Sequence, residues 1–458
     1  MTVARRLATW GLELRLEDVP AAVVHAVRRH LLDGLGCAFG AVRTGAAPSA
    51  MAWADLATAP EQASAIGLGV RRPTHVAAGV NGHLVHALDF DDTHAGGLVH
   101  ATSVVLPAAL AVGEEVGASV EDVVTAAIVG YEVVCRIAAA APHGFHRRGL
   151  HATSACGVFA AALVAARLRG LDADTAVDAL GIAGSLAGGS LEFLTTGSST
   201  KSLHPGFASA NAVLAATLAA AGADGPDSIL EGGHGLYRAL ADLDVAPEAV
   251  LDGLGTRWEA TRITVKPYPA CQLVHAPLDA LRTLDIDPTE VVGVEVTIPP
   301  DSVEIVAEPV AAKRRPRSDY EAKFSLAWCV ATVLVDGDLT IDAFDPARRD
   351  RPDVLALADR VTHVVVDPGV PAADAPGRVR VTTTDGQVHQ GTVAASRGGP
   401  ANPLSDADVV AKFTATAGDD AVASAGGLVA VLLADVLPAM SSPAPATAPS
   451  TAPSIRIH

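Results

Sequence analysis

The segment 81–100 concentrates side chains that can move protons. It begins NGHLVHALDFDDTH and holds four His and three Asp, although only 18% of the whole chain is charged. If a helix runs through it, His86 and Asp89 lie three residues apart and share a face with Thr93. His and Asp are common general acids and bases, so this cluster is the first candidate for catalysis. Two other interpretations stay open, namely helix-end capping by the acidic residues and a metal site.

Three further segments each present a side chain that could act on a substrate. HRRGLHAT carries His151, GSSTKSLHPG carries Lys201, and VKPYPAC carries Lys266 at a rigid turn. GSSTKSLHPG lacks the Walker spacing, so it does not predict a nucleotide phosphate loop, and Lys201 just before a helix suits a carboxylate instead. An isolated His151 is more often a structural group, so its function depends on the other segments.

Helical periodicity dominates residues 1–264. Apolar residues recur at three- and four-residue spacing, and Pro20 stands where a first helical turn tolerates proline. Ser119 and Asp122 form a capping-box-like pair ahead of one helix. We therefore expect one large all-helical domain, with helices near 20–35, 73–88, 103–116, 119–140, 154–168, 175–186 and 206–221.

The pattern changes over residues 265–404, where we expect a smaller α/β domain. Three stretches alternate at period two, and the last two flank an Asp385-Gly386 turn that predicts a hairpin. Ser318 begins a capping box that predicts one helix through Val335. The strands are predicted at 292–298, 378–382 and 387–393, and a further helix at 352–360. The fold class is therefore mainly α.

Two segments follow this domain. A helical pattern at 405–438 either extends the smaller domain or rejoins the helical one, and we favour the second. Residues 439–458 are rich in Pro, Ser, Ala and Thr, a composition that predicts a disordered tail.

Composition narrows the class of protein further. A chain of 458 residues that is 50% hydrophobic can bury two cores, and its net charge of −18 disfavours nucleic acid as a partner. The five cysteines lack CxxC spacing, so neither zinc nor an iron–sulfur cluster is predicted. The N-terminus lacks the apolar run of a signal peptide, and we see no convincing transmembrane segment. We expect a soluble cytoplasmic protein.

The motifs become specific when they are taken together. NGHLVHALDFDDTH, then His100 ahead of VLPAALAVGE, GYEVVCRI, HATSACGVFAAALVAARLRGLD, GSSTKSLHPGFASANAVLAATLAAAG, KPYPAC and EAKFSLAWCVA follow one another over residues 4–437. In this order they resemble the MmgE/PrpD family, which includes 2-methylcitrate dehydratases, cis-aconitate decarboxylases and an iminodisuccinate epimerase. The resemblance implies a helical domain with a smaller α/β lid domain, a homodimer, no metal and no cofactor.

The resemblance also implies which residues form the site, at a seam between the domains. By position, the family's catalytic residues correspond to Asp89, His100, His151 and Lys201. Thr93 and Lys266 match substrate-binding positions, and Trp328 and Cys271 are expected to line the same pocket. Three departures stand out. Ala101 replaces the usual Pro after His100, Trp328 replaces a common Tyr, and Cys271 stands where decarboxylases tend to carry a His, which weakens the decarboxylase option.

These residues predict a lyase that acts without a cofactor on a small polycarboxylic acid. His100 and His151 would exchange protons, and Lys201 with Lys266 would stabilise the charge that develops on a carboxylate when a neighbouring C–H is deprotonated. We expect dehydration of a 2-methylcitrate-like hydroxy acid first. An isomerase or epimerase, or a decarboxylase, acting on a related di- or tricarboxylate is the alternative. A catalytically inactive binding protein is the alternative of another class.

Overall fold

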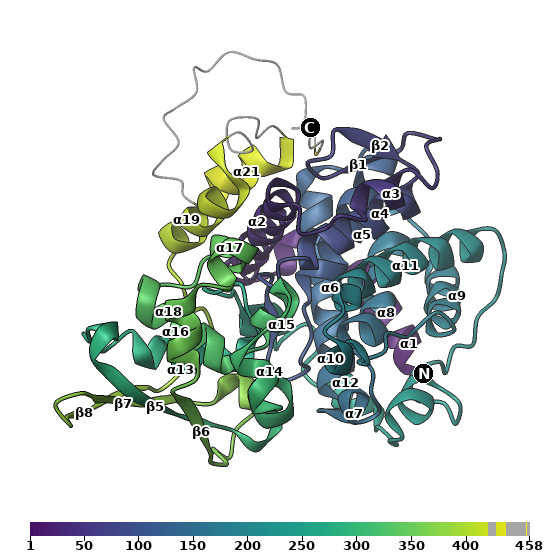
Figure 1. The fold of residues 1–458 in the computed structure, drawn as a ribbon. Coiled ribbons are helices and arrows are strands. Elements are labelled where there is room, and N and C mark those ends of the chain that lie inside the picture. Colours follow the sequence, from purple (N-terminus) through teal and green to yellow (C-terminus); the bar gives the residue numbers. More distant parts are fainter. Residues whose placement is uncertain (420–426, 437–454, 456–458) are drawn as a thin grey trace.

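The computed structural model describes residues 1–419, 427–436 and 455, and they form a helical part and a smaller α/β part (Figure 1). The helical part is built around α4 (Thr74–His86), α5 (Thr102–Val116), α6 (Val120–Ala139), α8 (Ala152–Leu168) and α11 (His204–Ala220). Around them lie α1 (Val3–Glu13), α2 (Ala21–Thr44), α3 (Ala50–Ala54), α7 (Gly144–Arg147), α9 (Ala173–Gly184), α10 (Phe193–Thr196) and α12 (Pro247–Leu251), with a small hairpin of β1 (Ala63–Ala65) and β2 (Val70–Arg72).

Small residues allow the central helices to pack closely. Residues 152–166 of α8 are all buried, and a Cβ added to Gly157 would lie 2.7 Å from Val104 Cγ1 on α5. The predicted capping box is confirmed at the start of α6, where the Ser119 and Asp122 side chains each accept a backbone N–H from the other residue. The mainly α fold class predicted from the sequence is therefore confirmed.

A glycine contact between α4 and α11 brings two of the predicted motifs together. A Cβ on Gly82 would lie 2.7 Å from both Cα and N of Gly206, so the two helix backbones touch at this point. Gly82 belongs to NGHLVHALDFDDTH, and Gly206 is the last residue of GSSTKSLHPG, which carries Lys201. This crossing therefore sets how closely Lys201 can approach the end of α4.

The smaller part contains a four-stranded sheet in the order β6-β5-β7-β8. Strand β5 (Val291–Ile298) pairs parallel with β6 (Val361–Val365) and antiparallel with β7 (Gly377–Thr383), which forms a hairpin with β8 (Val388–Val393). Alternate residues of β7 are buried, and α13 (His275–Leu281) packs against β7 and β8 (Figure 1). The remaining helices of this part are α14 (Val310–Arg314), α15 (Asp319–Lys323), α16 (Leu326–Asp336), α17 (Pro346–Arg349) and α18 (Pro352–Ala358).

Two sequence expectations in the smaller part need correction. The single helix predicted from Ser318 through Val335 is two helices, because the chain breaks after α15 and Ser325 caps α16 by accepting the Trp328 N–H. Strand β6 was not predicted, because most of its residues are at least partly exposed and its VTHVV sequence gives no alternation.

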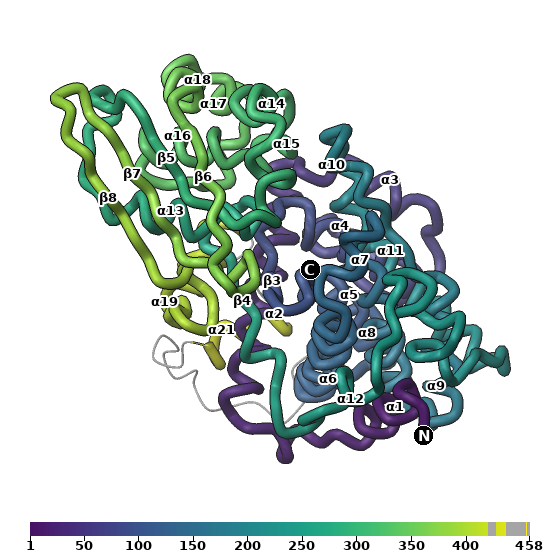
Figure 2. The backbone as a smooth tube through the Cα atoms, turned by 90° about the horizontal axis from the view of Figure 1, so that it is seen from below, coloured from purple at the N-terminus to yellow at the C-terminus, as the bar shows by residue number. Residues whose placement is uncertain are grey.

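The two parts meet along a short strand pair. Strand β3 (Thr93–His94) follows the acidic cluster and pairs with β4 (Ile263–Thr264), which ends two residues before Lys266. In Figure 2 these strands lie between the helical part and the sheet. The pairing therefore places VKPYPAC beside the end of NGHLVHALDFDDTH.

The chain returns to the helical part after the sheet. Helices α19 (Asp406–Ala417) and α21 (Gly427–Val436) pack against α2. Lys412 of α19 forms a salt bridge with Asp33 of α2 (2.7 Å) and donates to the carbonyl of Phe90 (2.7 Å). The predicted tail at 439–458 lies outside the described residues apart from Ile455.

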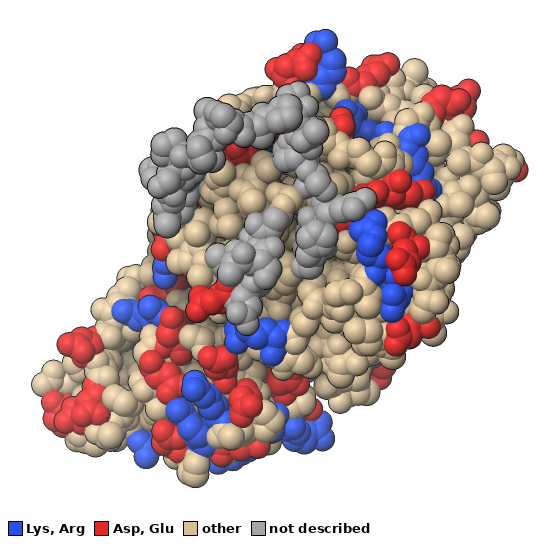
Figure 3. Space-filling view, turned by 90° about the horizontal axis from the view of Figure 1, so that it is seen from above, with Lys and Arg blue, Asp and Glu red and all other residues tan. Residues whose placement is uncertain are grey.

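On the face seen in Figure 3, Lys and Arg are interspersed with Asp and Glu over the described residues. None of the described helices combines the length and the apolar character needed to cross a membrane.

The glycine crossing gives the first prediction. Gly82→Ala should lower the free energy of unfolding by about 3 kcal/mol, because the new methyl group would meet backbone rather than a movable side chain. Chemical denaturation measures this change. Gly233→Ala is the matched control, since a Cβ there has no neighbour within 4 Å and no unusual backbone angle. Equal stability of the two variants would contradict the close crossing.

Candidate active site

Asp89 lies three residues beyond the end of α4, in a turn that directs its carboxylate into the seam. Its φ is +52°, in the left-handed region that Asp tolerates better than most residues. Only 1% of the residue is exposed. A strained backbone and a buried charge at one residue indicate a functional position, because both cost stability.

Two lysines converge on this carboxylate. Lys201 Nζ lies 2.7 Å from Asp89 Oδ1, and Lys266 Nζ lies 3.4 Å from the same oxygen and donates to the Asp89 carbonyl at 2.8 Å. Burial alone would raise the pKa of Asp89, but Lys201 and Lys266 outweigh it and hold that pKa well below its usual value. Asp89 is therefore ionised, and its Oδ2 has no hydrogen-bond partner among the described residues.

A third lysine reaches the seam from the smaller part. Lys323 ends α15, is 2% exposed and donates to the carbonyl of Ala87 at 3.3 Å. Burial lowers the pKa of Lys323, whereas Asp319 and Asp89 raise it. The sequence analysis did not predict Lys323 for this site. Lys323 lies in the EAKFSLAW motif, but the neighbouring residues do not distinguish it from a lysine on a solvent-exposed helix.

Three buried imidazoles lie beside these charges. Ring centroids are 4.6 Å apart for His86 and His100, 5.8 Å for His86 and His151, and 5.9 Å for His100 and His151. His100 is the most exposed of them, at 9%. The sequence predicted His100 and His151 for this site, and the structure adds His86, the last residue of α4.

Each imidazole is held through its Nδ1 atom. His86 Nδ1 contacts both carboxylate oxygens of Asp91 at 2.8 and 2.9 Å, and His100 Nδ1 donates to the Asp92 carbonyl at 2.7 Å. His151 Nδ1 lies 3.2 Å from Nδ1 of His204. These contacts leave the Nε2 atoms for a substrate, and His86 Nε2 has no protein partner among the described residues.

Burial and the neighbouring lysine keep two of these rings neutral. Burial lowers the pKa of His100 and of His151 well below the usual value, and the positive charge of Lys201 lowers both further. A neutral imidazole can accept a proton at neutral pH, so these side chains fit general base chemistry.

Of the other residues predicted for the site, Thr93 lies beside His100, whereas Trp328 lies away from the imidazoles. Thr93 Oγ1 lies 3.4 Å from His100 Nδ1, and Cys271 donates its backbone N–H to the carbonyl of Lys323 at 3.0 Å. Burial and then Asp89 raise the pKa of the Cys271 thiol, so it is protonated and a poor nucleophile. The structure does not bring Trp328 to the imidazoles. Its indole donates to the carbonyl of Arg349 inside the core of the smaller part.

A phenol that the sequence analysis did not single out reaches the seam instead. Tyr320 of α15 is 6% exposed, and its hydroxyl has no hydrogen-bond partner among the described residues. Its ring lies against Phe193 and Phe324. Burial and then the charge of Asp89 raise the pKa of Tyr320 well above its usual value, which keeps the phenol protonated. The break between α15 and α16 separates Tyr320 from Trp328.

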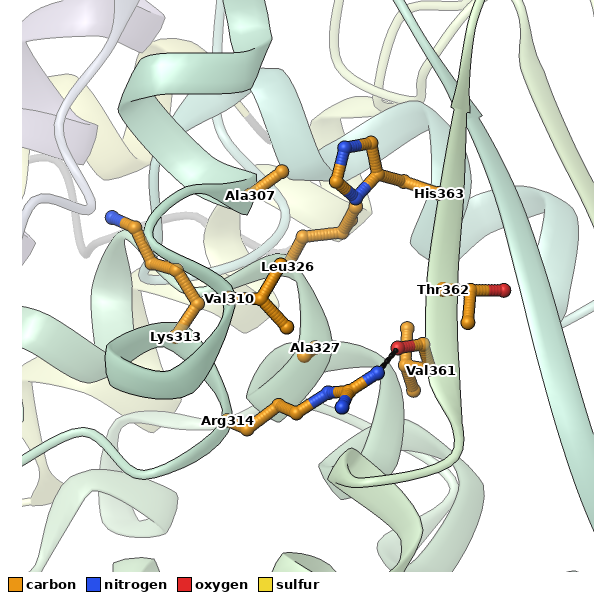
Figure 4. A pocket seen from close by; sticks show the side chains of 9 residues that line it. All are labelled: Ala307, Val310, Lys313, Arg314, Leu326, Ala327, Val361, Thr362 and His363. Atoms are coloured by element: carbon orange, nitrogen blue, oxygen red, sulfur yellow. Dashed lines mark hydrogen bonds between the residues drawn. The ribbon is translucent and has the colours of Figure 1, made fainter.

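A cavity in the smaller part lies away from these residues. It has a volume of about 190 Å³ and is lined by Lys313, Arg314, His363 and apolar residues (Figure 4). The Arg314 guanidinium donates to the carbonyl of Val361, and Lys313 donates to the carbonyls of Ile305 and Phe324. None of the predicted site residues lines this cavity, and its two basic side chains are already engaged in internal hydrogen bonds.

The two parts of the chain match the two domains of one known protein family. The MmgE/PrpD N-terminal domain matches residues 5–248, and the MmgE/PrpD C-terminal domain matches residues 268–425. The chain belongs to the MmgE/PrpD family. A cis-aconitate decarboxylase of Aspergillus terreus is 29% identical over 84% of this chain and 83% of its own length. The cis-aconitate decarboxylase of Homo sapiens is 26% identical over 91% of this chain and 88% of its own length.

A third relative of this MmgE/PrpD protein is a cis-aconitate decarboxylase-like protein of Aspergillus oryzae. It is 28% identical over 90% of this chain and 89% of its own length. The family predicted from the motifs is confirmed, and the comparisons support an enzyme of the lyase class.

The donor atoms of the site could also bind a metal ion. Nitrogen atoms of His86, His100 and His151 lie within 4.8 Å of one another, and an alternative set includes Asp89 and Asp91. Asp89, however, already contacts the ammonium groups of Lys201 and Lys266, and its single negative charge leaves one of their two positive charges uncompensated. Their positive charges favour an anion at this place over a cation.

We therefore predict that the MmgE/PrpD chain binds no stoichiometric metal. Elemental analysis of protein purified without a chelator should find well below one transition metal per chain. The melting temperature should also be the same in EDTA and in excess Zn²⁺, since a ligand of the native state would raise it. One bound metal per chain that is lost on His86→Gln would contradict this prediction.

Proposed function

We propose that this protein is a lyase that creates a carbanion beside a carboxylate of a small polycarboxylic acid. The observation that supports it is the meeting of Lys201 and Lys266 at Asp89, next to three buried imidazoles. A carbanion beside a carboxylate places a second negative charge on the carboxylate oxygens. Fixed ammonium groups in a buried site stabilise such charge strongly, because no solvent has to reorganise.

The roles of the side chains follow from their surroundings. Lys201 and Lys266 would bind a substrate carboxylate, with Asp89 keeping both ammonium groups in place before substrate arrives. His100 and His151 would exchange protons, and Thr93 would hydrogen-bond the substrate. Lys323 reaches the same seam from the smaller part, so binding of a polyanion would draw the two parts together.

Decarboxylation of cis-aconitate or a close analogue is the first candidate reaction. Two of the relatives named above are cis-aconitate decarboxylases and the third is a cis-aconitate decarboxylase-like protein, and all three align over most of the chain. In such a reaction the C–C bond to one carboxyl group breaks and CO₂ leaves. The electron pair is delocalised toward a remaining carboxylate, and carbon then takes a proton from an imidazole.

Dehydration of a 2-methylcitrate-like hydroxy acid is the second candidate. It is supported by the buried phenol of Tyr320, which can protonate a departing hydroxide, and by Cys271 at a position where decarboxylases tend to carry His. Here an imidazole takes a proton from carbon, the C=C bond forms, and hydroxide leaves as water. The same lysines would stabilise the charge in both reactions.

Turnover distinguishes these candidates. The chain should be incubated with cis-aconitate, 2-methylcitrate and citrate, and the products followed by proton NMR. We expect decarboxylation of cis-aconitate, with formation of CO₂, and no requirement for added metal. Water loss from 2-methylcitrate alone would favour the second candidate. Deuterium exchange without net reaction would indicate an isomerase, and no reaction with any of the three would contradict the proposal.

The variant Lys201→Ala tests the electrostatic step in this assay. It should lower kcat/KM by more than 100-fold, equivalent to about 3 kcal/mol of transition-state stabilisation. Lys313→Ala is the control, because Lys313 is a partly buried lysine with two internal hydrogen bonds and lies outside the site. Turnover of Lys201→Ala within tenfold of the wild-type value would contradict the assignment.

We also propose a homodimer in the cytoplasm, with α11 in its interface. Phe207, Leu214 and Leu218 lie on one side of this helix and are 45%, 43% and 42% exposed. Contiguous apolar side chains on a surface commonly mark a protein–protein contact. Light scattering should give about twice the chain mass of 46.4 kDa. Leu214→Glu should give the monomer mass, and a monomeric wild-type protein would contradict the proposal.

A further inference from the structure

The pair formed by His86 and Asp91 has the geometry of a catalytic dyad. The Asp91 carboxylate is fully buried and accepts the Nδ1–H of His86, with both oxygens within 2.9 Å. This contact fixes the neutral tautomer of His86, with a proton on Nδ1 and a lone pair on Nε2. The Nε2 atom is buried and has no partner among the described residues. An unpaired buried nitrogen costs stability unless a ligand meets it.

His86 differs from the other two imidazoles in what holds its Nδ1. The partner of His100 is a backbone carbonyl and that of His151 is another imidazole, whereas His86 contacts a carboxylate. A carboxylate stabilises the imidazolium that forms when the ring takes up a proton, and it also fixes the orientation of the ring. Of the three rings, His86 is therefore the one on which a proton is best accommodated.

We propose that His86, oriented by Asp91, is a further catalytic residue, whose Nε2 carries the proton that the reacting carbon gains or loses. This inference rests on the proposed lyase function. In decarboxylation, His86 first takes up a proton from solvent on Nε2, which gives an imidazolium that Asp91 stabilises. The carbanion left by CO₂ then takes that proton, and His86 returns to its neutral form. In dehydration, Nε2 of neutral His86 takes the proton from carbon, and the electron pair of that C–H bond forms the C=C bond. The departing hydroxide takes the proton of the Tyr320 phenol and leaves as water, and the proton held by His86 returns to the Tyr320 phenolate through solvent.

The charges around His86 support this assignment. Burial lowers the pKa of His86, and Asp91 opposes that effect most strongly by raising it. His86 and His100 together hold the pKa of Asp91 at about 2, although burial alone would raise it, so Asp91 stays ionised at neutral pH. The groups that face His86 from neighbouring elements are Asp89, Asp91, Lys201, His83, His100, His151 and His204.

A second buried pair provides matched controls. His94 Nε2 contacts Glu259 at 3.1 Å, and both residues are nearly fully buried. Its Nδ1, however, accepts the N–H of Gly97, so His94 has no free nitrogen for a substrate. His94 also follows Thr93 in a strand, and its side chain therefore points to the opposite face. His94→Gln and Glu259→Gln remove an imidazole and a charge of the same kind outside the site.

The test uses the full chain and whichever of cis-aconitate and 2-methylcitrate the wild-type protein converts. His86→Gln should lower kcat by about 100-fold or more and change KM less than threefold, because the lysines that bind carboxylates are intact. His94→Gln should keep kcat within about threefold of the wild-type value. Thermal melts should show both His variants folded at the assay temperature.

The variant Asp91→Asn distinguishes a role of Asp91 in proton transfer from a purely structural one. The measurement is the pH dependence of kcat. Without the carboxylate, the pKa of His86 in the complex falls. The limb of the kcat profile that reports His86 should therefore move by about one pH unit or more toward lower pH. Glu259→Gln should leave that limb in place. A purely structural role of Asp91 would lower activity without moving the limb.

The outcomes separate this inference from the proposed function. If the wild-type protein converts neither acid, the proposed function fails and the inference fails with it. If the wild-type protein is active but His86→Gln keeps kcat within threefold, or Asp91→Asn leaves the limb unmoved, only the inference is overturned. Loss of kcat in His86→Gln together with the shifted limb in Asp91→Asn supports it.

Discussion

The contact of the Asp89 carboxylate with Lys201 and Lys266 is the interaction on which the rest of the site depends. Two ammonium groups cannot be buried close together unless an anion compensates them, because each loses its hydration on folding. Asp89 supplies that anion while the site is empty. One carboxylate compensates only one of the two positive charges, and a substrate carboxylate can compensate the other.

Asp89, Lys201 and Lys266 come from distant parts of the chain, and the fold brings them together through two backbone contacts. The glycine contact of α4 and α11 brings Lys201 to the turn at Asp89, and the pairing of β3 with β4 brings Lys266 there. Lys323 adds a third ammonium group from α15, on the other side of the seam.

The orientation of each imidazole is fixed by a contact to its Nδ1 atom. Fixing Nδ1 with a carboxylate, a carbonyl or a second imidazole selects one tautomer for His86 and His100 and leaves Nε2 for chemistry. The lysines that favour an anionic substrate also disfavour protonated His100 and His151. Proton transfer in such a site depends on which imidazole contacts a carboxylate. The residue types alone do not show which of the three imidazoles has that contact.

The sequence by itself determined the helical part, most of the sheet and the family, because helical spacing, period-two alternation and capping pairs such as Ser119 with Asp122 are local properties. It also identified Asp89, His100, His151, Lys201 and Lys266, which lie in motifs. Only the tertiary structure decided that His86, Lys323 and Tyr320 face the seam and that Trp328 packs in a core. Burial and the direction of a side chain depend on contacts between segments hundreds of residues apart, and local sequence does not encode those contacts.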